Sequence, residues 1–301
     1  MRLYYCDHHA IPLPAGHKFP MEKYALLREV LSRESRFVFD RAEAAHADAI
    51  ESVHETAYVR QILSGDVPPA VMRRIGFPWS EGLVRRTLAS VGGTLEATAD
   101  ALRLGWGGNL AGGTHHAFRD SGAGFCVFND IAIAVRAFRA AGRFRRAAVL
   151  DLDVHQGDGT AAIFGEDSEV FTVSLHGGNN FPFRKQRSSI DVDLADGAGD
   201  HEFLASLASV LPAIRTFRPD ILFYQSGVDA LAGDRLGRLA LMQAGLKSRD
   251  EIVFQFCKEL ALPVVVTLGG GYGAEIRRTV EAHANTFLTA LEIFSVSPAS
   301  L

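Results

Sequence analysis

The sequence predicts an α/β fold with three layers, α/β/α, around a central and mostly parallel sheet. Short apolar runs rich in β-branched residues alternate with longer amphipathic segments, an order typical of α/β proteins. The runs are also nearly continuous in apolar character, as are strands buried on both faces of a sheet. Enzymes of this class reach 301 residues as one unit, so we expect a single domain over residues 1–301.

Four apolar runs are predicted to be strands, and each is followed by a loop rich in Gly, His or Asp. They span residues 147–152, 170–175, 221–224 and 264–268. Six segments whose apolar residues recur with a helical period are predicted to be helices. These span residues 22–31, 83–104, 131–141, 201–217, 251–260 and 275–291. The fifth helix is expected to begin at a capping box formed by Ser248 and Glu251.

Composition and charge exclude several classes of function. With 48% hydrophobic and 22% charged residues, the chain is not expected to be disordered. A formal net charge of −4 offers no basic surface for a phosphate backbone, so direct nucleic-acid binding is not expected. The three distant cysteines favour a reducing, cytoplasmic setting over a disulfide framework. No segment is apolar enough for a membrane partner, and the oligomeric state stays open.

Polar residues gather directly after the predicted strands. Because ligands of a parallel sheet bind outside the carboxyl ends of its strands, we expect these residues to converge on one crevice. They are Asp151, Asp153 and His155 after the first strand, His176 after the second, Asp229 after the third and residues 269–272 after the fourth, joined by residues 112–116.

The acidic and histidine residues of segment 151–155 alternate with apolar ones. On an extended backbone this spacing turns them to one face. Catalytic zinc takes three protein ligands and keeps one open position. We therefore predict that Asp153, His155 and the distant Asp229 bind a zinc ion. The isolated His54 and His176 are not counted as ligands.

The adjacent His115 and His116 are interpreted as acid/base residues. On a regular strand they would face opposite sides, but two preceding glycines permit a loop in which both enter the crevice. Carboxylates on Asp151 and Asp158 can orient their rings, and a histidine held by a carboxylate suits proton transfer to a leaving amine.

The glycine run 269–273 contains the remaining candidate, Tyr272. The run lacks the G-x-G-x-x-G spacing of a nucleotide loop. Its glycines instead permit a tight backbone path that brings the Tyr272 hydroxyl beside the metal. There the hydroxyl can donate a hydrogen bond to a developing oxyanion.

These segments resemble the zinc-dependent histone deacetylases and their bacterial relatives, which have the arginase-deacetylase fold. Residues 14–24 and 180–185 are similar to the class IV branch. Gln156 stands where many members carry a second histidine, beside the predicted ligand set and not in it. The matching motifs lie in the family's order at residues 53–59, 112–118, 124–130, 151–159, 226–229, 233–237 and 269–272.

The resemblance implies roles for individual residues. Zinc is implied on Asp153, His155 and Asp229, with His115 paired to Asp151 and His116, the main acid and base, paired to Asp158. The substrate site is implied at the Gly124 carbonyl, which accepts the substrate amide N–H, at the Phe125 ring, which flanks its alkyl stem, and at Gly270. A structural potassium ion is implied at the carbonyls of Asp151, Asp153, His155 and Leu175 and the Ser174 hydroxyl.

The predicted activity is zinc-dependent hydrolysis of an acylated amine, with an N6-acyl-lysine in a protein or peptide as the expected substrate and an acetyl or longer acyl group. The alternative is a deacetylase of acetylpolyamines or other small amides, because the same catalytic atoms serve both. A non-catalytic binding module is disfavoured, since no residue of the predicted site is missing.

A binuclear ureohydrolase of the arginase type is a further rival. Residues 189–196 imitate the acidic run of that family. A second metal would, however, need aspartates where Thr114 and Gly157 stand. We therefore interpret Asp191, Asp193 and Asp196 as parts of a solvated loop.

Overall fold

The computed structural model describes residues 1–295, which contain an eight-stranded sheet whose neighbouring strands are all parallel. The strands are β1 (Arg2–Tyr5), β2 (Val38–Arg41), β3 (Trp106–Asn109), β4 (Ala147–Asp151), β5 (Val170–Gly177), β6 (Ile190–Leu194), β7 (Ile221–Gln225) and β8 (Val264–Thr267). Across the sheet their order is β2-β1-β3-β8-β7-β4-β5-β6. The predicted α/β class is confirmed.

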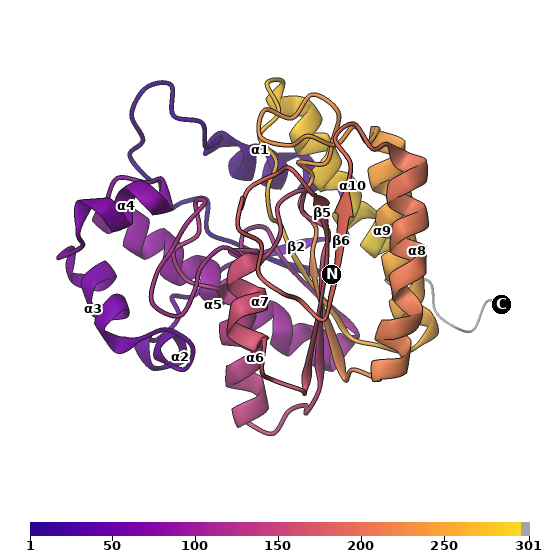
Figure 1. Cartoon of the computed structure of the whole chain (residues 1–301), viewed down its shortest axis with the longest axis horizontal. Coiled ribbons are helices and arrows are strands. Elements are labelled where there is room, and N and C mark those ends of the chain that lie inside the picture. The colour runs from indigo at the N-terminus through magenta and orange to yellow at the C-terminus, as the bar shows by residue number, and fades with distance from the viewer. Residues whose placement is uncertain (296–301) are drawn as a thin grey trace.

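Helices cover both faces of this sheet (Figure 1). They are α1 (Glu22–Leu31), α2 (Ala47–Glu51), α3 (Thr56–Ser64), α4 (Pro69–Ile75), α5 (Glu81–Leu104), α6 (Asp130–Ala140), α7 (Asp158–Phe164), α8 (Asp200–Phe217), α9 (Gln243–Glu259) and α10 (Ile276–Ser295). Helices α5, α6 and α7 lie on one face and α8, α9 and α10 on the other, with α1 packed against α10. Helices α2, α3 and α4 form an outer group beside α5.

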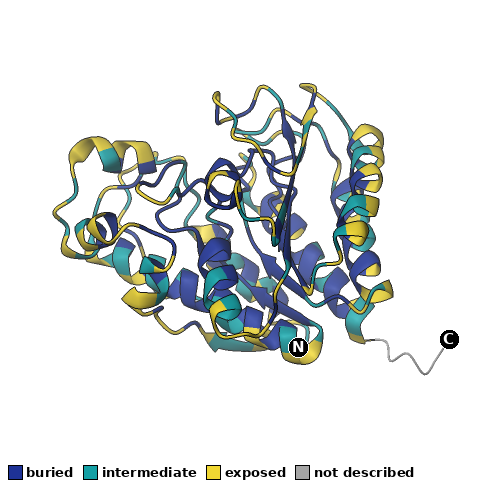
Figure 2. Cartoon of the chain, turned by 60° about the horizontal axis from the view of Figure 1, so that its bottom comes forward, coloured by how far each residue is buried: buried dark blue, intermediate teal, exposed yellow. Residues whose placement is uncertain are grey.

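Burial follows the layers. Every residue of β4, β7 and β8 is buried, as expected for central strands covered by helices on both faces. The helices bury the side that faces the sheet and expose the other (Figure 2). No helix within residues 1–295 combines the length and apolar character needed to cross a bilayer.

The predicted start of the fifth helix is wrong by two turns. Helix α9 begins at Gln243, so Ser248 and Glu251 lie inside it and form no capping box. The early turns were missed because one of their buried residues is Arg249, which broke the apolar pattern. Its guanidinium is held by Asp250 at 2.9 Å and by the Gly227 carbonyl at 2.6 Å, close to the site described below.

Of the acidic run predicted to be a solvated loop, Asp191 and Asp193 lie in the edge strand β6, whereas Asp196 lies in an exposed turn as expected. Strand β6 pairs with β5 in parallel register, and Asp191 and Asp193 are its exposed residues. An edge strand can carry charges on its solvent side, and such charges discourage pairing with other chains. Strands β1, β2 and β3 were also missed, because each has four residues and β3 contains two glycines.

The strand order determines where the polar loops meet. Strand β7 lies between β4 and β8, so the segments after these three strands are neighbours at the carboxyl edge of the sheet. Residues 112–116 join them, because the Leu268 N–H donates to the Ala111 carbonyl at 3.0 Å. The crevice predicted from the sequence lies at this edge.

Candidate active site

Asp153, His155 and Asp229 form the one group of potential metal ligands found within residues 1–295. All three are buried, and one ligand atom of each lies within 4.8 Å of the others. His155 Nδ1 is 3.0 Å from Asp153 Oδ1 and 3.1 Å from Asp229 Oδ2. Two carboxylates and one imidazole are a donor set that fits Zn²⁺ with an open fourth position.

Backbone N–H groups hold the other oxygens of the two aspartates. The Gly270 N–H donates to Asp153 Oδ2 at 2.7 Å, and the Val154 N–H donates to Asp229 Oδ1 at 2.9 Å. A Cβ at residue 270 would overlap Asp229 Oδ2, so only glycine fits there. Such contacts orient ligands for a metal. Gly270, implied in substrate binding, thus also contacts the ligand set.

Two histidine–aspartate pairs lie beside the ligand set. The rings of His115 and His116 are buried, and their centroids are 4.1 Å apart. His115 Nδ1 is 2.7 Å from Asp151 Oδ2, and His116 Nδ1 is 2.6 Å from Asp158 Oδ1. When neutral, a ring that donates its Nδ1 proton to a carboxylate has an acceptor at Nε2. The structure thus brings together all four residues of the predicted acid/base group.

The two histidines differ in their electrostatic surroundings. Burial lowers the pKa of His116 to about 4, helped by the neighbouring charge of His115 and opposed by Asp158. Burial also disfavours the charged form of His115, but Asp151 and Asp153 outweigh it and raise the pKa of His115 to about 9. These surroundings favour the neutral form of His116 and the charged form of His115.

A residue to which the sequence analysis gave no role, Asp130, holds the loop that carries the two histidines. Its carboxylate accepts the N–H groups of Gly113 at 3.0 Å and Thr114 at 2.8 Å and the Thr94 hydroxyl at 2.6 Å. Gly113 has a φ of +74°, which favours glycine. Asp130 fixes the path that turns both imidazoles inward. Its place within motif 124–130 was the available signal.

Tyr272 is buried, and it lines the inner end of a groove that opens on the protein surface. Its backbone N–H donates to Asp234 Oδ2 at 2.6 Å, and Arg235 Nε donates to its carbonyl at 2.8 Å. Its ring centroid is 6.4 Å from that of His155. Burial raises the pKa of Tyr272 well above its usual value, so the hydroxyl keeps the proton that it would donate.

Lys23 is a second residue that the sequence analysis missed. It is fully buried, its Nζ donates to the Gly269 carbonyl at 3.2 Å, and it lies 5.4 Å from the centroid of the Tyr272 ring. Burial lowers the pKa of Lys23 to about 8, although the carboxylates of Asp229 and Asp153 act in the opposite direction. Lys23 lies within segment 14–24, and the similarity of this segment to the class IV branch was the available signal.

A groove of about 640 Å³ leads from the surface to His116, His155 and Tyr272. Phe125 lines one part of it, with its ring centroid 5.8 Å from that of Tyr272. Phe181 also lines the groove, and its ring lies edge-on to that of His116 with the ring centroids 4.9 Å apart. The groove therefore has aromatic side chains near its inner end, of which Phe181 was not predicted.

Gly124 lies directly against the acid/base pair. A Cβ there would overlap His116 Cδ2, and its φ of +52° lies in the left-handed region. The following Phe125 also has a positive φ, +66°, and its N–H donates to the Ile75 carbonyl at 2.7 Å. This backbone path makes Gly124 part of the groove wall, as the resemblance implies.

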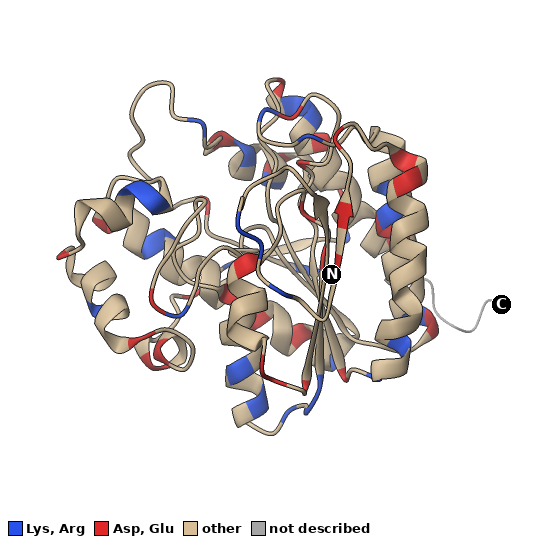
Figure 3. Cartoon of the chain, in the orientation of Figure 1, with Lys and Arg blue, Asp and Glu red and all other residues tan. Residues whose placement is uncertain are grey.

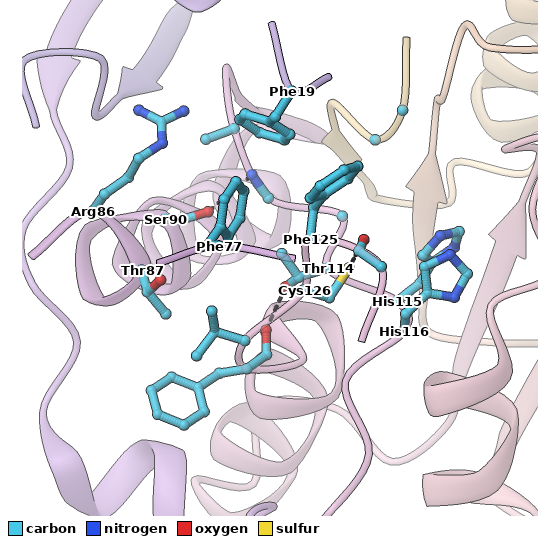
Figure 4. A pocket seen from close by; sticks show the side chains of 18 of the residues that line it. Phe19, Phe77, Arg86, Thr87, Ser90, Thr114, His115, His116, Phe125 and Cys126 are labelled. Carbon is cyan, nitrogen blue, oxygen red and sulfur yellow. Dashed lines mark hydrogen bonds between the residues drawn. The ribbon is translucent and has the colours of Figure 1, made fainter. Parts of the chain in front are cut away.

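A second, inner cavity of about 70 Å³ extends from the histidines into the protein (Figure 4). The rings of Phe19, Phe77 and Phe125 lie between the histidines and a polar group of Arg86, Thr87 and Ser90. The Arg86 guanidinium lies over the Tyr24 ring at 4.1 Å and donates to the Cys6 carbonyl at 3.2 Å. The site therefore has a space behind it that is lined by both aromatic and polar side chains.

The remaining candidates lie outside the metal group. The strand register places Ser174 opposite Asp151, and the Ser174 hydroxyl contacts His176 Nδ1 at 2.9 Å. Leu175 follows on β5. His54 accepts the N–H of Asn129 at 2.9 Å and thus has a structural role. Gln156 Nε2 donates to Asp191 Oδ1 at 2.7 Å, away from the three ligands.

Comparisons with known proteins agree with this arrangement. The model of the histone deacetylase domain matches residues 17–287. An uncharacterized protein of Picosynechococcus sp. is 42% identical over 294 residues, covering 96% of this chain and 98% of the relative. Histone deacetylase 2 of Arabidopsis thaliana is 31% identical over 265 residues, covering 82% of this chain and 66% of the relative.

A solved structure shares the fold. The crystal structure of an acetylpolyamine aminohydrolase from Burkholderia pseudomallei superposes with a TM-score of 0.80, covering 97% of this chain and 99% of that one. Its sequence is 24% identical. The likeness extends to the whole α/β architecture described above.

Proposed function

This chain belongs to the histone deacetylase family, and from that premise we propose that it removes acyl groups from N6-acyl-lysine side chains of peptides or proteins with one zinc ion. The proposed ligands are Asp153, His155 and Asp229. One observation carries the proposal: this buried donor set adjoins two histidine–aspartate pairs and a tyrosine at the inner end of an open groove.

The groove suits a long side chain with an amide near its end. The alkyl stem of the lysine would pass Phe125 and Phe181, and the Gly124 carbonyl would accept the amide N–H. The acyl chain would point into the cavity behind Phe125. In these positions the scissile carbonyl would lie near His116, Tyr272 and the proposed zinc ligands.

In the proposed reaction, a water oxygen bonds to the acyl carbonyl carbon and the C–N bond breaks. Bound zinc would supply Lewis-acid chemistry, which lowers the pKa of water and polarises a carbonyl. His116 takes a proton from the water at Nε2 and delivers it to the leaving nitrogen. Tyr272 donates a hydrogen bond to the carbonyl oxygen as that oxygen gains charge. The products are a carboxylate and a free lysine amine.

We assign the larger proton-transfer role to His116 because it lines both the groove and the inner cavity, whereas His115 lines only the latter. His115 Nε2 lies 3.9 Å from Asp153 Oδ1. We therefore assign to His115 mainly the adjustment of charge around the proposed ligands.

Replacing His116 by alanine should lower kcat by roughly 10²- to 10⁴-fold, the usual contribution of a general acid and base, while zinc is retained. Zinc content by mass spectrometry and steady-state kinetics of His116→Ala and His115→Ala provide the measurement. A much larger loss for His115→Ala, with zinc intact in both variants, would reverse the two roles.

The substrate is tested with fluorogenic peptides that carry acetyl-, butyryl-, octanoyl- or myristoyl-lysine, assayed beside acetylated polyamines. We expect peptide turnover, and the resemblance to class IV is the reason for including long chains. The aromatic part of the inner cavity should favour apolar acyl groups over polar ones of equal length. Turnover of acetylpolyamines with all peptides inert would instead establish the small-amine alternative.

A structural potassium ion also remains part of the proposal. The carbonyls of Asp151, Asp153, His155 and Leu175 and the hydroxyl of Ser174 would bind it. The pairing of Asp151 with Ser174 across β4 and β5 supports this assignment, because it brings the two segments side by side. The three cysteines are free and buried, which suits the reducing cytoplasmic setting that we propose for the enzyme.

A further inference from the structure

The outer part of the substrate groove is lined by cationic side chains from three separate segments. Lys18 lies before α1, Arg74 lies on α4, and Arg235 and Arg238 follow β7. All four are exposed. The residues that line this groove include no aspartate and no glutamate. The mouth of the groove, defined by these four cations, is therefore positively charged although the chain has a net charge of −4.

Little of this charge is neutralised locally. Arg238 pairs with Asp196 at 3.2 Å, and both side chains are about half exposed. Arg74 and Arg235 donate to the backbone carbonyls of Gly122 and Tyr272, and neither forms an ion pair within residues 1–295. Within the described residues, Lys18 has no hydrogen bond or ion pair. Lys and Arg also mark α4 and the loop between β5 and β6 (Figure 3).

The carboxylates nearest the groove do not reverse this sign. Asp234 is turned inward and accepts three backbone N–H groups, from Leu236, Gly237 and Tyr272. Asp151, Asp153, Asp158 and Asp229 are buried, contact histidines and, in the proposed enzyme, adjoin a divalent cation. A ligand approaching from solvent meets the four exposed cations first.

The mouth also offers apolar surface. Phe183 is 85% exposed and lines the groove, and Phe181, which is 37% exposed, lines it closer to His116. Large exposed aromatic residues beside a groove are typical of surfaces that bind polypeptide. A small polyamine has several ammonium groups and no side chains to place on such rings.

We propose that the mouth of the groove selects acyl-lysines whose flanking residues are acidic and rejects cationic substrates, polyamines included. This inference rests on the proposed deacylase function and specifies its substrate class. Complementary charge at the mouth acts mainly on the rate at which enzyme and substrate associate, and it makes this rate dependent on salt. A concave surface of one sign concentrates ligands of the opposite sign.

The test compares peptides of one length that carry a central acetyl-lysine flanked by Glu, by Ser and Gly, or by Lys, with N-acetylspermidine as a fourth substrate. At low salt we expect kcat/KM to fall from acidic through neutral to basic flanks, by at least about tenfold overall. The difference should shrink at about 0.5 M salt, where charges are screened within a few ångströms.

Charge reversal identifies the residues responsible. In the zinc-loaded enzyme, Lys18→Glu with Arg238→Glu should invert the preference, measured as the ratio of kcat/KM for the peptides with acidic and basic flanks. Arg60→Glu with Arg145→Glu changes the net charge equally at exposed positions outside the groove and should leave the preference intact.

The outcomes separate this inference from the function on which it rests. Equal kcat/KM for acidic and basic peptides, or N-acetylspermidine as the fastest substrate, would overturn the selection by charge while leaving a working deacylase. Inactivity toward all peptides, the neutral one included, would overturn the proposed acyl-lysine activity itself. An inverted preference in the control pair would assign the effect to net charge and contradict a role of the mouth.

Discussion

Replacing Asp229 by alanine should reduce the zinc content from about one ion per chain to nearly none and abolish activity. Asp229 is one of the three buried side chains proposed as ligands, and it reaches the other two from the segment after the neighbouring strand β7. Loss of a residue that merely supports a ligand typically costs about 10- to 100-fold in metal affinity, so loss of a ligand should cost more. Dialysis against a chelator followed by metal analysis provides the measurement.

The same substitution leaves the Val154 N–H without its acceptor, so Asp229→Asn, which keeps the shape of the side chain, is measured beside it. Circular dichroism reports whether each variant folds. Asp66→Ala, at an exposed residue away from the site, should keep both zinc and activity. Full activity of Asp229→Ala after chelator treatment, or two tightly bound metals in the wild-type chain, would contradict the mononuclear site.

Replacing Tyr272 by phenylalanine should lower kcat by about 10²- to 10³-fold, or about 3 to 4 kcal/mol, and leave KM nearly unchanged. The hydroxyl is the group proposed to stabilise charge that develops on the substrate oxygen, and this charge is largest in the transition state. The ring, which packs near Phe125 and Lys23, is retained, so folding and zinc binding should survive. Steady-state kinetics with the best peptide provide the measurement.

The matched control is Tyr5→Phe, which removes a phenol hydroxyl from β1, outside the groove and the inner cavity. It should leave kcat unchanged. If Tyr272→Phe retained more than about a third of the wild-type kcat, no important hydrogen bond from this hydroxyl would exist in the transition state. A large rise in KM without a change in kcat would instead assign Tyr272 to substrate binding.

The geometry also bears on the rival binuclear ureohydrolase. Thr114, which stands where a second metal would need an aspartate, donates its hydroxyl to the Asp130 carboxylate at 2.6 Å. Asp191 accepts from Gln156 at 2.7 Å and Asp193 lies 2.8 Å from His176. Within residues 1–295 these aspartates join no group of three potential ligands. The acidic run thus belongs to the edge of the sheet and not to a metal site.

The sequence by itself determined the fold class and most of the central strands. Strands β4, β5, β7 and β8 are buried on both faces, so their apolar runs appear directly in the sequence. The ligand candidates were also accessible, because Asp153 and His155 follow one such strand and Asp229 follows another. Ligands generally bind at the carboxyl ends of parallel strands. This rule connected Asp229 with Asp153 and His155, which are more than 70 positions away in the sequence.

Only the tertiary structure decided which side chains support these residues and what lines the entrance. Lys23, Asp130 and Arg249 reach the site through contacts with backbone groups. Lys23 and Asp130 lie within matching motifs, but which backbone groups they contact is decided only by the packing of the chain. The mouth is likewise composed of four cations from three distant segments. Their common position, and with it the local charge, depends on how loops pack over the sheet, which the average charge of the chain does not reveal.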